Sequence, residues 1–220
     1  MRPGPLVRRL FGRYESGVAE AYRRIFVDLD DLARIIGAWV PQAKKILEVG
    51  CGEGAMTQRI VRTYPTASVT AIDITPNLGR LFQGPTSTVT FCQETVADVA
   101  RREPRSFDLV VLADVIHHVP ADARRPLMCA IDQAMVPNGS MLFKDWVASA
   151  TPIHWLCAIS DRYLTGDDVS YCTMGGINAL MTGIFGPGTI RRTDTVRPWH
   201  NNVAVLVQRS DPPFSRGHGK

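Results

Sequence analysis

The chain has 220 residues and a formal net charge of +4, and 45% of its residues are hydrophobic. This length supports one sizeable α/β domain rather than two. No apolar run approaches the ~20 residues that a membrane-spanning helix requires. Arginine pairs are scattered along the chain instead of being gathered as in a dedicated nucleic-acid binder. Composition therefore favours a globular domain and argues against a membrane span and a nucleic-acid partner.

The first part of the chain, residues 1–42, is predicted to be a helical cap that belongs to the same domain. Apolar side chains recur there at helical spacing, and Pro41 ends the pattern. The basic start lacks a long apolar stretch and a small-residue cleavage site, so we expect no secretory signal. The five cysteines include no Cys-x-x-Cys pair. Free thiols in the cytoplasm fit this spacing best.

After Pro41, short apolar runs alternate with helical stretches. The runs predict strands at residues 45–49, 68–73, 88–92, 107–113 and 140–145, and the stretches between them predict helices at residues 55–63, 76–82, 96–102 and 121–135. This alternation predicts a parallel sheet with crossover helices. Two later strands, at residues 189–196 and 202–208, are close enough in sequence to form an antiparallel hairpin.

The predicted fold class is therefore α/β, a Rossmann-like doubly wound sheet of about seven strands. The sheet is mostly parallel and carries the antiparallel hairpin at its end. The domain occupies residues 43–209, with a helical insertion at about 151–186 that covers the substrate. Residues 210–220, rich in Pro, Gly and polar residues, read as a flexible tail.

The strongest chemical signal is the stretch at residues 46–54, ILEVGCGEG, which follows a strand and opens a helix. Glycines at alternate positions let the chain turn tightly and let a ligand approach the backbone. Their spacing is shorter than the Gly-x-Gly-x-x-Gly of nicotinamide-binding folds. Asp73 ends the next predicted strand, where a carboxylate can accept hydrogen bonds from ribose hydroxyls.

These motifs, followed by Phe107-Asp108-Leu109-Val110-Val111 and His117-His118-Val119, resemble class I S-adenosylmethionine-dependent methyltransferases, in particular the group that acts on small molecules. The resemblance is close over residues 43–147 and covers the remainder in layout only. It implies S-adenosyl-L-methionine as the cofactor. The residues that it places at the cofactor are Glu48, Gly50, Cys51, Gly52, Gly54, Asp73, Ile74, Ala113 and Asp114. Glu94, Thr95 and Val96 stand where the family usually has an acid for the adenine amine.

The catalytic base is predicted among the histidines that follow the fourth and fifth strands. Histidine suits this role because its ordinary pKa of ~6.5 lies near working pH. We expect His117 to be the base, with His154 as the second candidate, although a packing role is the alternative for either. The expected substrate contacts are His118, Asp145, Trp146, Tyr163 and Tyr14. No metal ligand set is evident in the sequence.

The leading hypothesis is methyl transfer to a small-molecule acceptor, with O-methylation of a hydroxylated or phenolic metabolite favoured over N- or C-methylation. An RNA or protein methyltransferase is one alternative. A non-methylating member of the fold, such as a cyclase that uses the cofactor structurally, is another, because fold alone does not define the reaction. We expect a monomer or a homodimer.

Overall fold

The computed structural model describes residues 26–149, 151 and 169–209. Within these residues, one seven-stranded sheet has the strand order β3-β2-β1-β4-β5-β7-β6. The strands are β1 (Lys45–Val49), β2 (Ser68–Asp73), β3 (Val89–Gln93), β4 (Phe107–Ala113), β5 (Met135–Trp146), β6 (Ile190–Thr195) and β7 (Asn202–Gln208). The helices are α3 (Leu29–Trp39), α4 (Ala55–Thr63), α5 (Val96–Arg102), α6 (Ala121–Ala134) and α8 (Met174–Phe185), with short 3-10 turns η2 (Thr86–Thr88) and η3 (Ile116–His118).

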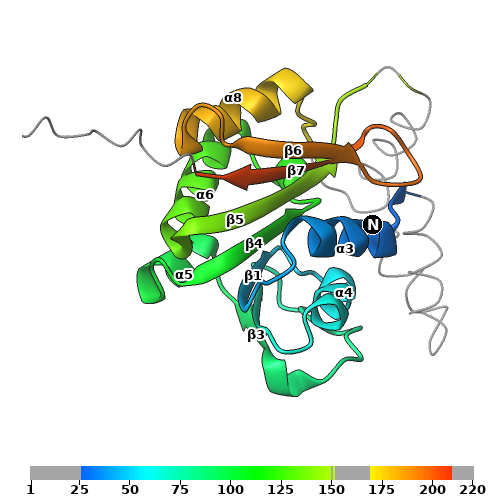
Figure 1. Cartoon of the computed structure of the whole chain (residues 1–220), viewed down its shortest axis with the longest axis vertical. Coiled ribbons are helices and arrows are strands. Elements are labelled where there is room, and N and C mark those ends of the chain that lie inside the picture. The colour runs from blue at the N-terminus through cyan, green and yellow to red at the C-terminus, as the bar shows by residue number, and fades with distance from the viewer. Residues whose placement is uncertain (1–25, 150, 152–168, 210–220) are drawn as a thin grey trace, which may run out of the picture.

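The strand pairing confirms the predicted fold class. β1 pairs in parallel with β2 and β4, β2 with β3, and β4 with β5. β7 runs antiparallel to both β5 and β6. The arrows of β4 and β5 therefore point to the same edge of the sheet in Figure 1, while β7 points the other way. Loops that follow the parallel strands meet at that common edge.

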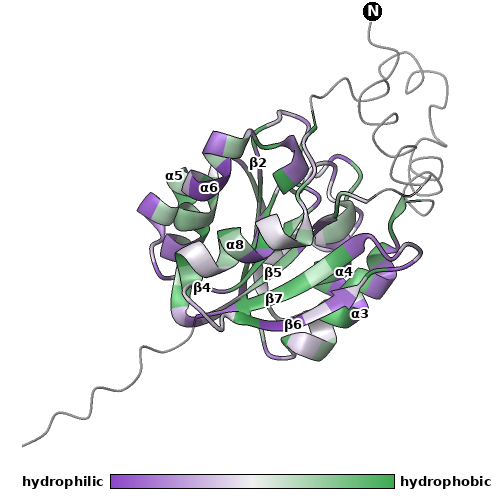
Figure 2. Ribbon diagram, turned by 90° about the horizontal axis from the view of Figure 1, so that it is seen from above, coloured by the Kyte–Doolittle hydropathy of each residue, from purple (hydrophilic) through white to green (hydrophobic). Residues whose placement is uncertain are grey.

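Helices cover both faces of the sheet, so the protein has three layers (Figures 1 and 2). On one face α5, α6 and α8 pack against apolar side chains that include Val110, Met141 and Val205. On the other face α3 and α4 pack against Ile46, Leu109 and neighbouring residues. The central strands are apolar on both faces because helices bury both, as parallel sheets require.

Side-chain caps fix where several helices begin. Asp28 accepts hydrogen bonds from the backbone N–H groups of Asp30 and Asp31 at the start of α3. Thr95 and Asp98 form a reciprocal capping box at α5. Thr173 caps α8, and the glycines at 175 and 176 lie in the first turn of that helix.

One predicted helix, at residues 76–82, is wrong. The backbone there uses its N–H groups on another segment, since Gly79 N donates to Gly52 O at 2.9 Å and Leu81 N donates to Glu53 O at 2.9 Å. Gly79 also has a φ of +64°, which a right-handed helix excludes. These residues form turns that brace the glycine-rich loop instead of a helix.

The predicted N-terminal cap is described from residue 26 onward, and α3 packs against α4 within the domain core. The predictions for the earlier residues, for most of the 151–186 insertion and for the 210–220 tail concern residues outside those that the structure describes. Among the helices that are described, none has the length and apolar character needed to cross a membrane.

Candidate functional site

A cavity of about 270 Å³ lies at the carboxyl ends of β1 and β4. Ligands of open α/β sheets bind at this edge. Its lining comes from α3, β1, the glycine-rich loop, the start of α4 and the end of β4: Leu29, Glu48, Val49, Gly50, Cys51, Gly52, Glu53, Ala55, Met56 and Ala113. The structure thus brings together five of the residues predicted to hold the cofactor. Gly54 caps the helix behind them.

The glycine-rich loop owes its shape to backbone conformations that favour glycine. Gly50, Gly52 and Gly54 have φ values of +78°, +50° and +89°. A Cβ atom on Gly50 would come within 2.3 Å of Val115 Cγ2, so this loop touches the loop that follows β4. A Cβ atom on Gly52 would meet nothing within 4 Å. The loop is therefore closely packed at Gly50 and open at Gly52.

Glu48 lies beneath this loop with only 3% of its surface exposed. Its Oε2 atom has no hydrogen-bond partner among the residues that the structure describes. Burial raises the pKa of Glu48 to about 7, and the nearby Asp73 carboxylate adds to the rise. A buried carboxylate oxygen that lacks a partner and lines a cavity is suited to a polar or cationic ligand group.

We expect the stability of the protein to depend on pH through Glu48. The pKa of Glu48 is higher in the folded protein than in the unfolded chain. The protonated side chain therefore contributes to the free energy of unfolding at pH values below the unfolded pKa, and this contribution is lost as pH rises through about 7. Glu48→Gln removes this loss and should increase the free energy of unfolding at pH 8 by about 1–3 kcal/mol. Denaturant unfolding at pH 4.5 and pH 8 measures the difference. An equal effect at both pH values would contradict the prediction.

Asp73 and Ile74 follow β2 beside the glycine-rich loop. The Asp73 carboxylate accepts hydrogen bonds from Gly52 N at 2.8 Å and from Thr75 N at 2.9 Å. Ile74 is 74% exposed and is the one large hydrophobic side chain of the described residues that lies so open. Asp73 therefore already supports the loop, and Ile74 offers an uncovered apolar surface next to it.

The residues predicted near the adenine amine have other partners in the structure. Thr95 caps α5, and Val96 is buried in the core. The Glu94 carboxylate forms an ion pair with Arg102. None of these three lines the cavity. Their role at a cofactor stays a prediction.

His117 lies at the carboxyl end of β4, in η3, and is 5% exposed. Its Nδ1 atom is 2.5 Å from Asp145 Oδ1, and its backbone N–H donates to Asp145 Oδ2 at 3.2 Å. Asp145 Oδ1 also accepts from Trp146 N at 2.7 Å. A carboxylate that is hydrogen-bonded to Nδ1 fixes the orientation of the ring and leaves Nε2 as the nitrogen that can take up or release a proton. The sequence predicted Asp145 as a substrate contact; in the structure it is 1% exposed and holds His117.

A second charged pair lies beside this one. Lys144 is fully buried in β5, and its Nζ atom is 2.6 Å from Asp114 Oδ1. Asp114 has a φ of +56°, a rare conformation for a residue with a side chain. Asp114, His117 and Asp145 offer ligand atoms within 4.8 Å of one another. The Lys144 ammonium and the His117 ring already engage both carboxylates, so a metal-free site stays our prediction.

The other predicted substrate contacts and the second candidate base, His154, fall into three cases. His118 is exposed next to His117, with ring centroids 4.1 Å apart. Trp146 is buried and makes an edge-on contact with Phe26, so it lies in the core rather than open to a ligand. His154, Tyr163 and Tyr14 lie outside the described residues.

Sequence reasoning missed Tyr171 and underrated Lys144. The Tyr171 ring stacks on His117 with ring centroids 5.2 Å apart and an interplanar angle of 17°. Tyr171 lies 54 residues after His117 in the sequence, and no local motif marks it. A lysine inside an apolar strand was a usable signal, because lysine is almost never fully buried without a partner.

Residues 46–139 match the family model described as "Methyltransferase domain". The chain is 32% identical over 120 residues to a ubiquinone biosynthesis O-methyltransferase of Yersinia enterocolitica, covering 53% of this chain and 47% of the relative. It is 23% identical over 167 residues to the demethylspheroidene O-methyltransferase of Rhodobacter capsulatus, covering 74% and 40%. The chain spans less than half the length of these two curated relatives.

Solved structures share the fold. A 1,6-didemethyltoxoflavin-N1-methyltransferase of Burkholderia thailandensis, with 1,6-didemethyltoxoflavin and S-adenosylhomocysteine bound, superposes with a TM-score of 0.67 at 16% identity, covering 94% of this chain and 88% of that one. Mitomycin 7-O-methyltransferase gives a TM-score of 0.66 at 14% identity, covering 83% and 53%. Residues 46–139 therefore resemble a methyltransferase domain, and the described sheet shares the fold of these solved methyltransferases.

Proposed function

We propose that this protein transfers the methyl group of S-adenosylmethionine to a small molecule, by O-methylation of a hydroxylated or phenolic acceptor. The observation that carries the proposal is the cavity at the ends of β1 and β4, with open space at Gly52 and the orphaned Glu48 carboxylate oxygen below. The O-methyltransferase relatives support the choice of an oxygen acceptor.

The residues present fit the cofactor. Open space at Gly52 provides room where any side chain would intrude. The unpartnered Glu48 oxygen suits the positively charged methionine end, and exposed Ile74 suits the flat face of adenine. Asp73 is placed to accept hydrogen bonds from the ribose hydroxyls, because each carboxylate oxygen can accept a second bond beside the one it already has.

When bound, S-adenosylmethionine supplies a methyl group already activated by the sulfonium. The protein then has to orient the acceptor and remove its proton. His117 would take a hydroxyl proton through Nε2, while Asp145 accepts from Nδ1 and stabilises the imidazolium that forms. Holding the reactants near attack geometry contributes ~7–11 kcal/mol in well-oriented systems.

Calorimetry with S-adenosylmethionine and S-adenosylhomocysteine tests the proposed cofactor. Incubation with a panel of phenolic compounds, followed by detection of S-adenosylhomocysteine, tests the reaction. Release of that product separates methyl transfer from a cyclase that keeps its cofactor intact. We place the enzyme in the cytoplasm as a monomer or homodimer; the free thiols of Cys51, Cys92, Cys129 and Cys172 support a reducing compartment.

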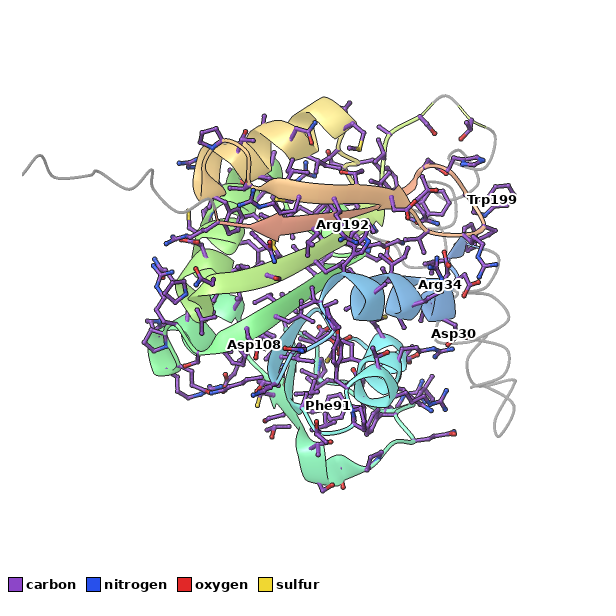
Figure 3. All side chains as sticks on the ribbon, viewed as in Figure 1. Asp30, Arg34, Phe91, Asp108, Arg192 and Trp199 are labelled. Atoms are coloured by element: carbon purple, nitrogen blue, oxygen red, sulfur yellow. The ribbon has the colours of Figure 1, made fainter. Side chains whose placement is uncertain are left out.

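Asp73→Ala is expected to weaken binding of S-adenosylmethionine by ~1.5–3 kcal/mol, because hydrogen bonds from ribose to a charged group are lost. The matched control is Asp108→Ala. Asp108 also accepts two backbone N–H bonds, from Lys44 and Lys45, but lies at the amino end of β4, opposite the cavity (Figure 3). Calorimetry measures the affinity of both variants for S-adenosylmethionine. Similar losses in the two would mean that Asp73 acts only by bracing the backbone.

A further inference from the structure

A short segment far along the chain lies against the candidate base. Ser170 N donates to His117 O at 2.8 Å. Two residues on, Cys172 pairs with Val147 beyond the end of β5, and Ala148 N donates to Cys172 O at 2.9 Å. The 170–172 segment is thus bonded both to η3, which carries His117, and to the chain that leaves β5.

Arg124 of α6 fastens this segment from the other side. Its Nε atom donates to Val119 O at 2.9 Å, and its Nη2 atom donates to Ser170 O at 2.5 Å. Its Nη1 atom lies 3.0 Å from Cys172 Sγ. The planar guanidinium presents its donors in a fixed fork. One side chain therefore sets the distance between the loop after β4 and the 170–172 segment.

The segment delivers Tyr171 to the face of the His117 ring, where the two rings stack at an angle of 17°. Asp145 holds the edge of the same imidazole through Nδ1. A hydrogen bond at one ring atom resists rotation in the plane but leaves the ring able to tilt about that bond. A second ring stacked on the imidazole face restricts the tilt.

We propose that Arg124 and Tyr171 are positioning residues for His117, with Arg124 fixing the 170–172 segment so that Tyr171 holds the imidazole against Asp145. This inference rests on the proposed function, in which His117 takes the acceptor's proton. The direction of Nε2 then depends on a segment that lies within the predicted substrate cover at residues 151–186.

Nuclear magnetic resonance of the protein labelled with ¹⁵N-histidine tests the positioning directly, without an acceptor. The His117 signals are assigned by their loss in His117→Asn. In Tyr171→Leu we expect the His117 ring protons to move downfield, because the shielding by the stacked ring is lost. Tyr171→Phe keeps an aromatic ring and should keep the wild-type spectrum.

Arg124→Ala should reproduce the shift seen in Tyr171→Leu. The neighbouring Arg125→Ala is the matched control, since Arg125 is exposed and contacts only Gly183 O, at 3.4 Å, among the hydrogen bonds recorded for it. His117 signals that stay unchanged in folded Arg124→Ala or Tyr171→Leu would overturn the proposal. Because Arg124→Ala keeps the Tyr171 ring, a purely structural role of Arg124 would lower the melting temperature without moving these signals in the folded protein.

Turnover gives a second measure once an acceptor is in hand. We expect Tyr171→Leu and Arg124→Ala to lower kcat about ten- to a hundredfold, as misplaced groups do, with unchanged affinity for S-adenosylmethionine. An unchanged kcat would overturn the proposal. Failure of the proposed function has a different signature: wild-type protein would bind no S-adenosylmethionine, while the stacking signal of His117 would persist.

Discussion

Gly52→Val is expected to abolish binding of S-adenosylmethionine while the protein still folds. Glycine at this position leaves open space in the cavity, since a Cβ atom would meet nothing within 4 Å. A branched side chain would occupy the volume that the ligand needs. Titration calorimetry should detect no heat of binding, and circular dichroism should show a folded protein. Unchanged affinity would contradict the proposal that the glycine-rich loop binds S-adenosylmethionine.

The backbone strain of this variant needs a control of its own, because Gly52 has a φ of +50° that valine rarely adopts. Gly186→Val provides it. Gly186 also has a positive φ, +95°, and open space around its missing Cβ, but it caps the end of α8 and does not line the cavity. Gly52→Asn adds a second comparison, since asparagine tolerates a positive φ and still fills the space. We expect it to weaken binding as well.

His117→Asn is expected to lower the rate of methyl transfer by 10²–10⁴-fold, the usual range for loss of a general base. The asparagine amide can replace Nδ1 as the donor to Asp145, so the buried carboxylate keeps a partner. His117→Ala would leave that carboxylate with backbone N–H partners alone, and loss of a side-chain partner from a buried polar group typically costs about 1–3 kcal/mol of stability. The asparagine variant therefore separates chemistry from folding.

Single-turnover kinetics with an acceptor found by screening measures this effect. Affinity for S-adenosylmethionine should stay close to the wild-type value, because His117 does not line the cavity. His200→Asn, at an exposed position between β6 and β7, is the matched control and should retain most of its turnover. A loss of less than tenfold in His117→Asn, together with weaker cofactor binding, would mark His117 as a packing residue and direct attention to His154.

The sheet could be predicted almost strand by strand because its periodicity is simple. β1, β2, β4 and β7 have the predicted bounds. Strands that are buried on both faces have continuous apolar runs, and these runs are bounded by polar and turn-forming residues. The strand at β5 is longer than predicted, since it begins directly at the end of α6 and includes Pro137 and Gly139. Such residues usually mark a turn, so the sequence placed the start of this strand too late.

The segment at residues 76–82 shows where local pattern fails. Its composition allowed a helix, but its N–H groups bond to Gly52 O and Glu53 O. These contacts join residues about 27 positions apart, and no local window contains both partners. The glycine-rich loop could be predicted from its own residues, whereas the turns that support it could not.

The candidate base could be predicted because its position depends on a local feature, whereas its partners come from distant parts of the chain. His117 follows a strand end, a position that sequence alone gives. Asp145 could also be placed near a strand end from the sequence. Whether its side chain faces a ligand or His117 depends on its burial, which the sequence pattern does not determine. Tyr171 and Arg124 reach the site from a later segment and from α6, so only the assembled fold brings them there.

The turns at residues 76–82 also bear on the thermodynamics of ligand capture. Their hydrogen bonds and the ion pair between Arg80 and Glu53, at 2.6 Å, hold the glycine-rich loop in one shape before any ligand arrives. The conformational entropy of ordering the loop is then lost during folding rather than during association. A loop prepared in this way accepts its ligand as a rigid receptor. Substitution of Arg80, which does not itself line the cavity, would release Glu53, loosen the loop and reduce affinity for the ligand.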